Sequence, residues 1–127
     1  MEDINIEKIK NLIETSNLNL HSTHKTLCIP IINRIYKKMI YGIQFDAIKV
    51  YDNLIIDGHH RYISSLLANY ALNDNSYPKT SATIKCKWSK VEFTEEDWDT
   101  PAKINRLNKK DAEFNNLSID EIISILK

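Results

Sequence analysis

The chain has 127 residues, of which 43% are hydrophobic and 27% are charged, and its 17 basic and 17 acidic side chains give a formal net charge of zero at pH 7. This length and apolar content fill one hydrophobic core, so the sequence predicts a single domain over residues 1–127. Zero net charge excludes a general attraction to nucleic acid, and no apolar run approaches the roughly 20 residues that cross a bilayer, so we expect neither a duplex DNA partner nor a membrane partner.

The cysteine content predicts a reducing compartment. Cys28 and Cys86 lie far apart in the sequence and match no metal or redox spacing, which is typical of structural thiols. The start of the chain, Met1-Glu2-Asp3, lacks the basic and then apolar order of a signal peptide. We expect a soluble cytoplasmic protein, or a domain that is delivered from a larger secreted protein.

The first third of the sequence predicts a helix, a strand and a second helix. Apolar residues recur at helical spacing over 4–15 behind Asp3, which predicts an amphipathic helix capped by that aspartate. A short strand is expected at 26–29, and Pro30 can open the next helix because its missing amide hydrogen needs no partner there. Gly42 is expected to end this helix. Its buried stripe would comprise Ile31, Ile32, Ile35, Tyr36, Met39 and Ile40, opposite Asn33, Arg34, Lys37 and Lys38.

The middle third predicts a β-hairpin that leads into a helix. Strands are expected at 48–50 and 54–56, because alternating and continuous apolar residues flank a tight turn at 52–53. Apolar residues then repeat at three- and four-residue steps, which predicts a helix over 59–73. A polar loop through Pro78 is expected to follow.

The segment 84–88 predicts another strand. Its apolar residues alternate with lysines, which favours Trp88 in the core and Lys85 and Lys87 on a solvated face. Together with Lys90 these side chains also resemble a basic strip that binds single-stranded nucleic acid, an interpretation that we favour less because Trp88 shares its face with apolar residues.

The C-terminal part predicts helices over 100–127 behind a core at about 24–93. Helix starts are expected at Glu95-Glu96-Asp97, at Thr100-Pro101 and at Ser118, where Glu121 completes a capping box and Leu117 and Ile122 form a hydrophobic staple. We find no internal repeat and no low-complexity segment.

Residues 54–72 form the unit that carries the candidate chemistry. A buried strand runs into a turn at Gly58 and then into a helix whose first turn carries His59, His60 and Arg61. The first amides of a helix lack internal partners and lie at the positive end of its dipole, so they favour an anion. Gly58 lets a ligand approach the backbone, and Arg61 can bind two oxygens of a phosphate. The sequence therefore predicts a phosphate or nucleotide site at this turn.

Three side chains of the turn are candidate catalytic groups. His59 and His60 can donate hydrogen bonds or exchange protons near neutral pH. Asp57, at the end of the strand, could orient a histidine, accept a proton or help to hold a metal ion such as magnesium. The alternative is a plain Asp-Gly turn with two exposed histidines and a solvated arginine. We favour the site, because a helix start disfavours charged imidazoles unless an anion offsets the dipole.

Two further histidines offer a weaker possibility. His21 and His24 stand three apart in an expected loop, and with His59 and His60 they could make a metal site. Their spacing fits no standard zinc pattern, so we expect no metal at these histidines. His24 and Lys25 could instead border the phosphate pocket.

The residues from 55 to 62 carry a family resemblance. Their sequence is Ile55-Ile56-Asp57-Gly58-His59-His60-Arg61-Tyr62. This string resembles the signature of the ParB/sulfiredoxin superfamily, in which a strand ends in a Gly-x-x-Arg turn at a helix start and binds nucleotide phosphates. The expected order of strand, helix and hairpin over 26–56 is similar to that fold as well. The resemblance implies a small α/β (α+β) fold, in which a small mixed sheet is flanked by helices.

Within this superfamily the motif implies phosphoryl-group chemistry. Sulfiredoxins carry their catalytic cysteine where this chain has His59, so sulfinic acid reduction is not expected. Members with Asp-Gly-His-x-Arg include small-molecule kinases and domains at the ends of bacterial polymorphic toxins. By resemblance, Gly58 and the amides of residues 59–61 would hold phosphates. Asp57 and His60 would lie near the reacting group.

The sequence thus leads to two hypotheses. The first is a phosphate- or nucleotide-binding enzyme that transfers a phosphoryl group or hydrolyses a nucleotide or phosphodiester. Its expected ligands are ATP or CTP and magnesium, and its favoured context is a bacterial toxin effector with a cognate immunity or regulatory protein. The second is a non-catalytic module that senses a nucleotide or binds a partner protein, as an immunity or regulatory protein does.

Overall fold

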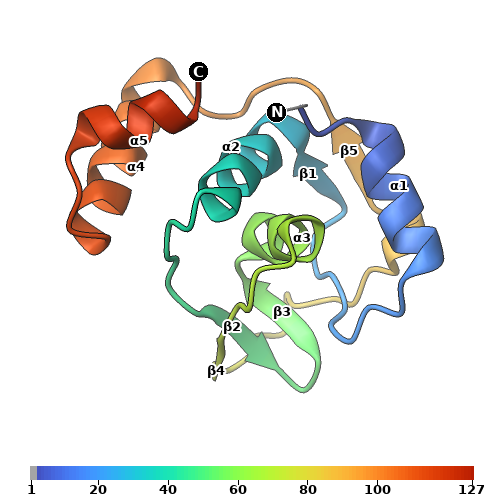
Figure 1. Cartoon of the computed structure of the whole chain (residues 1–127). Coiled ribbons are helices and arrows are strands. Elements are labelled where there is room, and N and C mark those ends of the chain that lie inside the picture. Colours follow the sequence, from blue (N-terminus) through green and yellow to red (C-terminus); the bar gives the residue numbers. More distant parts are fainter. Residues whose placement is uncertain (1–2) are drawn as a thin grey trace.

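A computed structural model describes residues 3–127 and has the α+β architecture expected from the sequence, with helices around small sheets (Figure 1). In chain order the elements are α1 (Ile6–Thr15), β1 (Thr26–Cys28), α2 (Ile29–Ile40), β2 (Ile48–Tyr51), β3 (Leu54–Asp57), α3 (His59–Ala68), β4 (Asp74–Ser76), the 3₁₀ helix η1 (Trp88–Lys90), β5 (Glu92–Thr94), α4 (Pro101–Phe114) and α5 (Ile119–Ile125). Within residues 3–127 every helix is too short or too polar to cross a bilayer.

The strands form two sheets around the central helix α3. Strands β3 and β2 make the expected antiparallel hairpin, and β4 joins β2 in parallel to give a mixed sheet of order β3-β2-β4. Strands β1 and β5 pair in parallel. Helix α3 contacts α1, α2, β1 and β2, and Figure 1 shows it between α2 and the hairpin. The first turn of α3 therefore lies where several elements meet.

One apolar core holds these elements together. Five of its side chains come from α1, β1, α2, β3 and α3 and are 0% exposed, namely Ile9, Leu27, Ile32, Ile55 and Ile63. Burial of each of these five side chains stabilises the folded state by about 1.5–3 kcal/mol of transfer free energy. The core fixes α3 against both sheets.

Helices α4 and α5 build on a separate, smaller apolar cluster. Ile43, Ala112 and Ile122 form its buried part. Figure 1 shows the two helices side by side, beyond α2 and away from the main core. A polar contact links them to α2, since Lys38 Nζ lies 2.6 Å from Asp111 Oδ2. Ionic and apolar contacts together therefore attach the C-terminal helices.

Several local signals are confirmed. Gly42 has φ +85° and ends α2 in a Schellman motif, because its N–H donates to Met39 O and the N–H of Ile43 donates to Lys38 O. The hairpin turn at 52–53 has positive φ at both residues, as a type I′ turn requires. The helix starts at Thr100 and Ser118 are confirmed by side-chain caps, and Glu121 completes the capping box with Ser118.

The first helix differs from the prediction at its start. It begins at Ile6 and not at residue 4, and its cap is Asn5, whose side chain accepts the N–H of Lys8. Asp3 instead forms an ion pair of 2.6 Å with Lys37 of α2. The pKa of Asp3 is lowered mainly by its hydrogen bond to Lys37. The carboxylate of Asp3, which the sequence predicted as the helix cap, therefore pairs with a lysine that is distant in the sequence.

The predicted faces and ends of two helices also need correction. In α2, Lys38 was expected on the solvated face but is 4% exposed, because its ion-pair partner Asp111 lies on α4. Ile40 was expected on the buried face but is 45% exposed. Helix α3 ends at Ala68 and not at residue 73. Asn69 adopts φ +54° and caps it, so the apolar residues after it belong to a connection to β4.

The predicted strand at 84–88 is wrong. Cys86 makes one isolated bridge with Ser22, Ile84 is 70% exposed, and Trp88 lies in η1. Trp88 is nevertheless buried at 8% exposure, as expected.

The segment at 95–97 forms a bend and not a helical turn. Strands β4 and β5 were not predicted, and β4 lacks an apolar signal because all of its residues are exposed.

Candidate functional site

Gly58 joins the end of β3 to the first turn of α3. It has φ +106° and ψ 27°, a left-handed conformation that residues with a Cβ rarely adopt. A Cβ here would overlap the side chain of Ile48 and would lie 3.0 Å from Nη2 of Arg61. Glycine is therefore required both for the backbone conformation and for the close packing of the turn on β2.

The first amides of α3 have no internal acceptor. The N–H of Tyr62 donates to the carbonyl of Gly58 at 2.9 Å, and this is the first bond of the helix. Within residues 3–127 no acceptor is bonded to the amides of His59, His60 or Arg61. These N–H groups lie at the positive end of the helix dipole, so an anion next to them would be stabilised.

His59 points into the protein and is 2% exposed. Its Nε2 accepts the backbone N–H of Thr23 at 3.0 Å, while the hydroxyl of Thr23 donates to the carbonyl of Ile55 at 2.6 Å. A backbone N–H can only donate, so Nε2 is unprotonated and the proton of the neutral ring is on Nδ1. Nδ1 is buried and has no partner in the described part of the chain. His59 thus holds an unused N–H donor.

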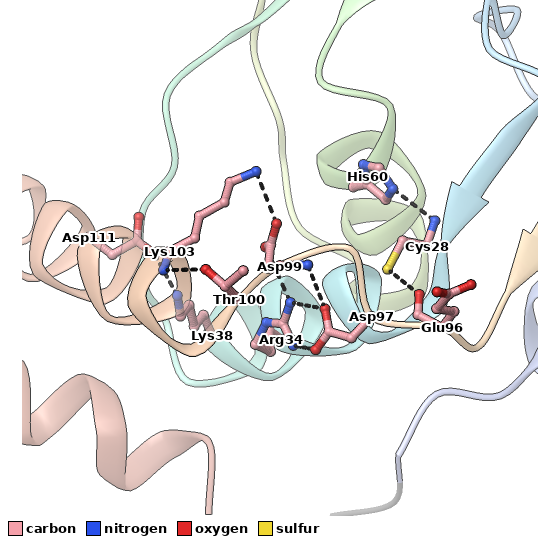
Figure 2. Close-up of polar contacts among 10 residues, drawn as sticks. All are labelled: Cys28, Arg34, Lys38, His60, Glu96, Asp97, Asp99, Thr100, Lys103 and Asp111. Carbon is pink, nitrogen blue, oxygen red and sulfur yellow. Dashed lines mark hydrogen bonds and ion pairs between the residues drawn. The ribbon is translucent and has the colours of Figure 1, made fainter.

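His60 makes the corresponding contact one residue later. Its Nε2 accepts the N–H of Cys28 at 2.9 Å, and its ring packs edge-on against Trp98 with centroids 5.5 Å apart. Figure 2 shows this hydrogen bond joining the start of α3 to the end of β1. The same argument places the proton of the neutral His60 ring on Nδ1.

Both imidazoles are neutral at pH 7. The pKa of His59 is lowered to about 3, mainly by burial, and the neighbouring His24 and His60 act in the same direction. Burial also lowers the pKa of His60 to about 4; His24 and Lys103 act in the same direction, and Asp99 opposes them. With Nε2 occupied, neither ring has a free lone pair to take up a proton, so the geometry offers them as hydrogen-bond donors.

Asp57 and Arg61 lie together at the end of β3. The side chain of Asp57 is 64% exposed, and its Oδ2 lies 3.5 Å from Nη2 of Arg61. Nη1 of Arg61 donates to the carbonyls of Asp46 at 2.9 Å and Ala47 at 3.3 Å. Arg61 therefore anchors the segment before β2, and only part of its guanidinium is available to a ligand.

The structure divides the predicted site residues into two groups. His59 and His60 turn toward the β1 side, whereas Asp57 and Arg61 pair with each other beside β2. Across residues 3–127 no hydrogen bond or ion pair joins Asp57 to either imidazole. Asp57 and His60, which the resemblance places near one reacting group, are therefore not in contact with each other in this arrangement.

His24 completes a cluster of imidazoles on the solvent side. Its ring stacks on His59 with centroids 3.8 Å apart and an angle of 14° between the planes. His24 is exposed, unlike its partner. The sequence placed His24 near the pocket only as a loop residue, because a contact across 35 positions leaves no local pattern.

A charged network that the sequence did not reveal lies beside His60 (Figure 2). The side chain of Asp99 is 2% exposed and pairs with Nη2 of Arg34 at 3.2 Å and with Nζ of Lys103 at 3.0 Å. Arg34 also binds both carboxylate oxygens of Asp97, at 2.7 and 2.9 Å. That contact raises the pKa of Arg34 and lowers the pKa of Asp97. Lys103, at 48% side-chain exposure, keeps its ammonium near solvent.

The cysteines are free thiols in the structure, as expected. Cys28 is buried, and its Sγ donates to the carbonyl of Glu96 at 3.3 Å, which ties the end of β1 to the segment before α4 (Figure 2). Cys86 is half-buried. Cys28 therefore holds together the two segments that flank His60.

No metal centre is evident in the described ranges, since residues 3–127 contain no convergent group of three or more histidine, cysteine or acidic side chains. Magnesium at Asp57 thus stays a prediction that would need oxygen ligands from a substrate.

Comparison of the chain with protein-family models, with curated proteins and with solved structures found no match.

Proposed function

We propose that this protein binds a phosphate group, carried by a nucleotide or a phosphorylated small molecule, at the first turn of α3. One observation carries the proposal: the amides of residues 59–61 have no acceptor where they follow the left-handed Gly58. The imidazole of His60, whose proton lies on Nδ1, adds a neutral donor at the same turn. A set of backbone and imidazole donors suits a phosphate better than a cation.

Lys103 and the free part of Arg61 would supply positive charge. Asp99 holds the ammonium of Lys103 at 3.0 Å, and the charge of Lys103 is felt at His60, whose pKa it lowers. A dianionic phosphate next to His60 would gain from both cations. The proposed site therefore extends from the turn at Gly58 toward the start of α4.

The enzymatic form of the proposal is phosphoryl transfer, or hydrolysis of a nucleotide or phosphodiester, in a ParB/sulfiredoxin-like protein. ATP or CTP with magnesium is its substrate class, and a toxin effector with a cognate immunity protein is its context. His60 would orient the phosphate by donating a hydrogen bond from Nδ1, and the buried His59 would hold the start of α3 in place through its contact with Thr23. Proton transfer would fall to Asp57 or to His24, because both are exposed and neither accepts a backbone amide.

The second candidate is a non-catalytic module that senses a nucleotide or binds a partner protein. This candidate is favoured because Nε2 of both His59 and His60 already accepts a hydrogen bond from a backbone N–H. Those imidazoles then serve the fold and the binding of a phosphate, and no proton transfer is required of them.

The test is binding followed by turnover. Thermal unfolding is measured with ATP, CTP, GTP, their diphosphates and inorganic phosphate, with and without magnesium. A ligand at 100 times its Kd stabilises the folded protein by about 2.7 kcal/mol. We expect Arg61→Ala and Lys103→Ala to weaken binding about tenfold or more, and Lys109→Ala, which changes an exposed lysine of α4, to leave it unchanged.

Product analysis then separates the two candidates. Consumption of the nucleotide that is lost in Asp57→Asn or His24→Ala supports the enzyme, whereas binding without consumption supports the sensor. If no phosphate-bearing compound raises the unfolding temperature and none is consumed, the proposed site is refuted.

A further inference from the structure

A pocket of about 310 Å³ lies where the C-terminal end of α1, the segment before β1 and residues 85–89 meet. Its volume falls within the range of about 300–1,000 Å³ that small-molecule sites occupy. None of residues 57–61 lines it. It is therefore separate from the turn of α3, and a ligand could bind here whether or not a phosphate binds at that turn.

One wall of the pocket is apolar and firmly held. Ile13, Leu18 and Trp88 contribute to it. Nε1 of Trp88 donates to the carbonyl of Leu20 at 2.9 Å, and its indole stacks on Tyr62 with centroids 6.1 Å apart. The hydrogen bond of Nε1 and the stacking on Tyr62 together fix the orientation of the indole, so this wall of the pocket is preformed.

The remaining lining is polar and contains no carboxylate. It comprises Lys85, Lys87, His21 and two serines. The neighbouring Cys86 donates its N–H to the carbonyl of Ser22 at 2.8 Å, which fixes the backbone between the two lysines. Across the described part of the chain, neither lysine forms an ion pair with an acidic side chain.

We propose that this pocket binds a small amphipathic anion. The apolar body of the ligand packs on Trp88, and a carboxylate or phosphate head lies between Lys85 and Lys87. Burying the apolar body against the indole removes apolar surface from water, which favours binding. The two ammonium groups then select an anionic head over a neutral or cationic one.

The experiment is isothermal titration of the whole chain with octanoate and with octyl phosphate, each below its micelle concentration. Octyltrimethylammonium is the cationic probe of matched length. We expect at least one anion to bind and the cation to bind at least about tenfold more weakly. Fluorescence of a Trp98→Phe variant, in which Trp88 is the remaining tryptophan, should change with the same midpoint. Octanoate and octyl phosphate together tell which head group is preferred.

Matched variants locate the site. Lys85→Glu with Lys87→Glu should weaken anion binding at least about tenfold, whereas Lys90→Glu, which changes an exposed lysine outside the pocket, should not. Arg61→Ala should leave the binding of octanoate, which carries no phosphate, unchanged, and this separates the pocket from the turn of α3. Equal binding of the cation, no binding of either anion, or equal loss in Lys90→Glu would overturn the proposal.

Discussion

His24 lies face to face on His59, with the two ring centroids 3.8 Å apart. The outer ring meets solvent, and the inner ring is 2% exposed. Burial is the main cause of the lowered pKa of His59, and the neighbouring His24 acts in the same direction. The inner imidazole is therefore neutral at pH 7, and the stack covers the start of α3 from one side.

The first prediction concerns the tautomers of the two motif imidazoles. Because backbone amides of Thr23 and Cys28 donate to Nε2, the neutral rings of His59 and His60 should carry their proton on Nδ1. Nitrogen chemical shifts of labelled histidine at pH 7 report this directly. His24, whose ring nitrogens are bonded to no backbone amide in residues 3–127, is the internal comparison. A proton on Nε2 of either motif ring would contradict the assignment.

The second prediction is that stability falls as the pH drops below 6.5. The folded pKa values of His59 and His60 are about 3 and about 4, against an ordinary value of 6.5. The unfolded chain therefore binds more protons across this interval, and the free energy of unfolding decreases toward acid. At pH 5 the loss is about 2 kcal/mol for each histidine.

Urea unfolding between pH 7 and pH 5 measures this loss. His59→Gln, which cannot be protonated and keeps an acceptor for Thr23, should show a shallower dependence than the natural chain. Constant stability over the interval would show that the imidazoles are not buried as described.

The parts of the fold that follow from short-range chemistry could be predicted. The positive φ values at 52–53 and at Gly42, and the caps at Thr100 and Ser118, depend on residues within a few positions of one another. By contrast β4 is made of three exposed polar residues, and only its pairing with β2 makes it a strand. No periodicity could reveal it.

The candidate site shows the same division. The sequence located the turn at Gly58 and the histidines that follow it, because a strand and a helix flank a glycine there. It could not show that His60 accepts the N–H of Cys28, which is 32 positions away. Nor could it show that Asp99 and Lys103, which are close to each other in the sequence, lie near His60, which is far from both. Of the two roles expected from the sequence, hydrogen-bond donation and proton exchange, the contacts of Nε2 favour hydrogen-bond donation.

The third prediction compares two glycines with positive φ. Gly58→Ala should be far more destabilising than Gly42→Ala. Gly42 has φ +85° and open space where the methyl group of alanine would lie, so alanine there costs only the left-handed strain of about 1–2 kcal/mol. At Gly58 the same strain is joined by overlap with Ile48, which adds roughly 1–3 kcal/mol. Equal losses in chemical denaturation would mean that the turn does not pack on β2 as described.

The fourth prediction concerns the ion pair between Lys38 and Asp111, which attaches α4 to α2. Lys38 Nζ lies 2.6 Å from the carboxylate, and the two side chains are 5% and 19% exposed. Lys38→Met alone leaves a half-buried carboxylate without its partner and should cost about 2–4 kcal/mol. Adding Asp111→Leu should recover most of the loss, because two apolar side chains can pack where two charges were. Denaturation of the single and double variants gives the coupling energy directly.

The matched control for this cycle is the pair of Lys37 with Asp3. Its distance is also 2.6 Å, but Asp3 is 71% exposed. Exposed pairs of this kind contribute about 0–1 kcal/mol, so Lys37→Met should be nearly neutral. If the two lysine variants lose the same stability, burial does not set the strength of the Lys38 contact. The C-terminal helices would then be held mainly by the apolar cluster around Ile122.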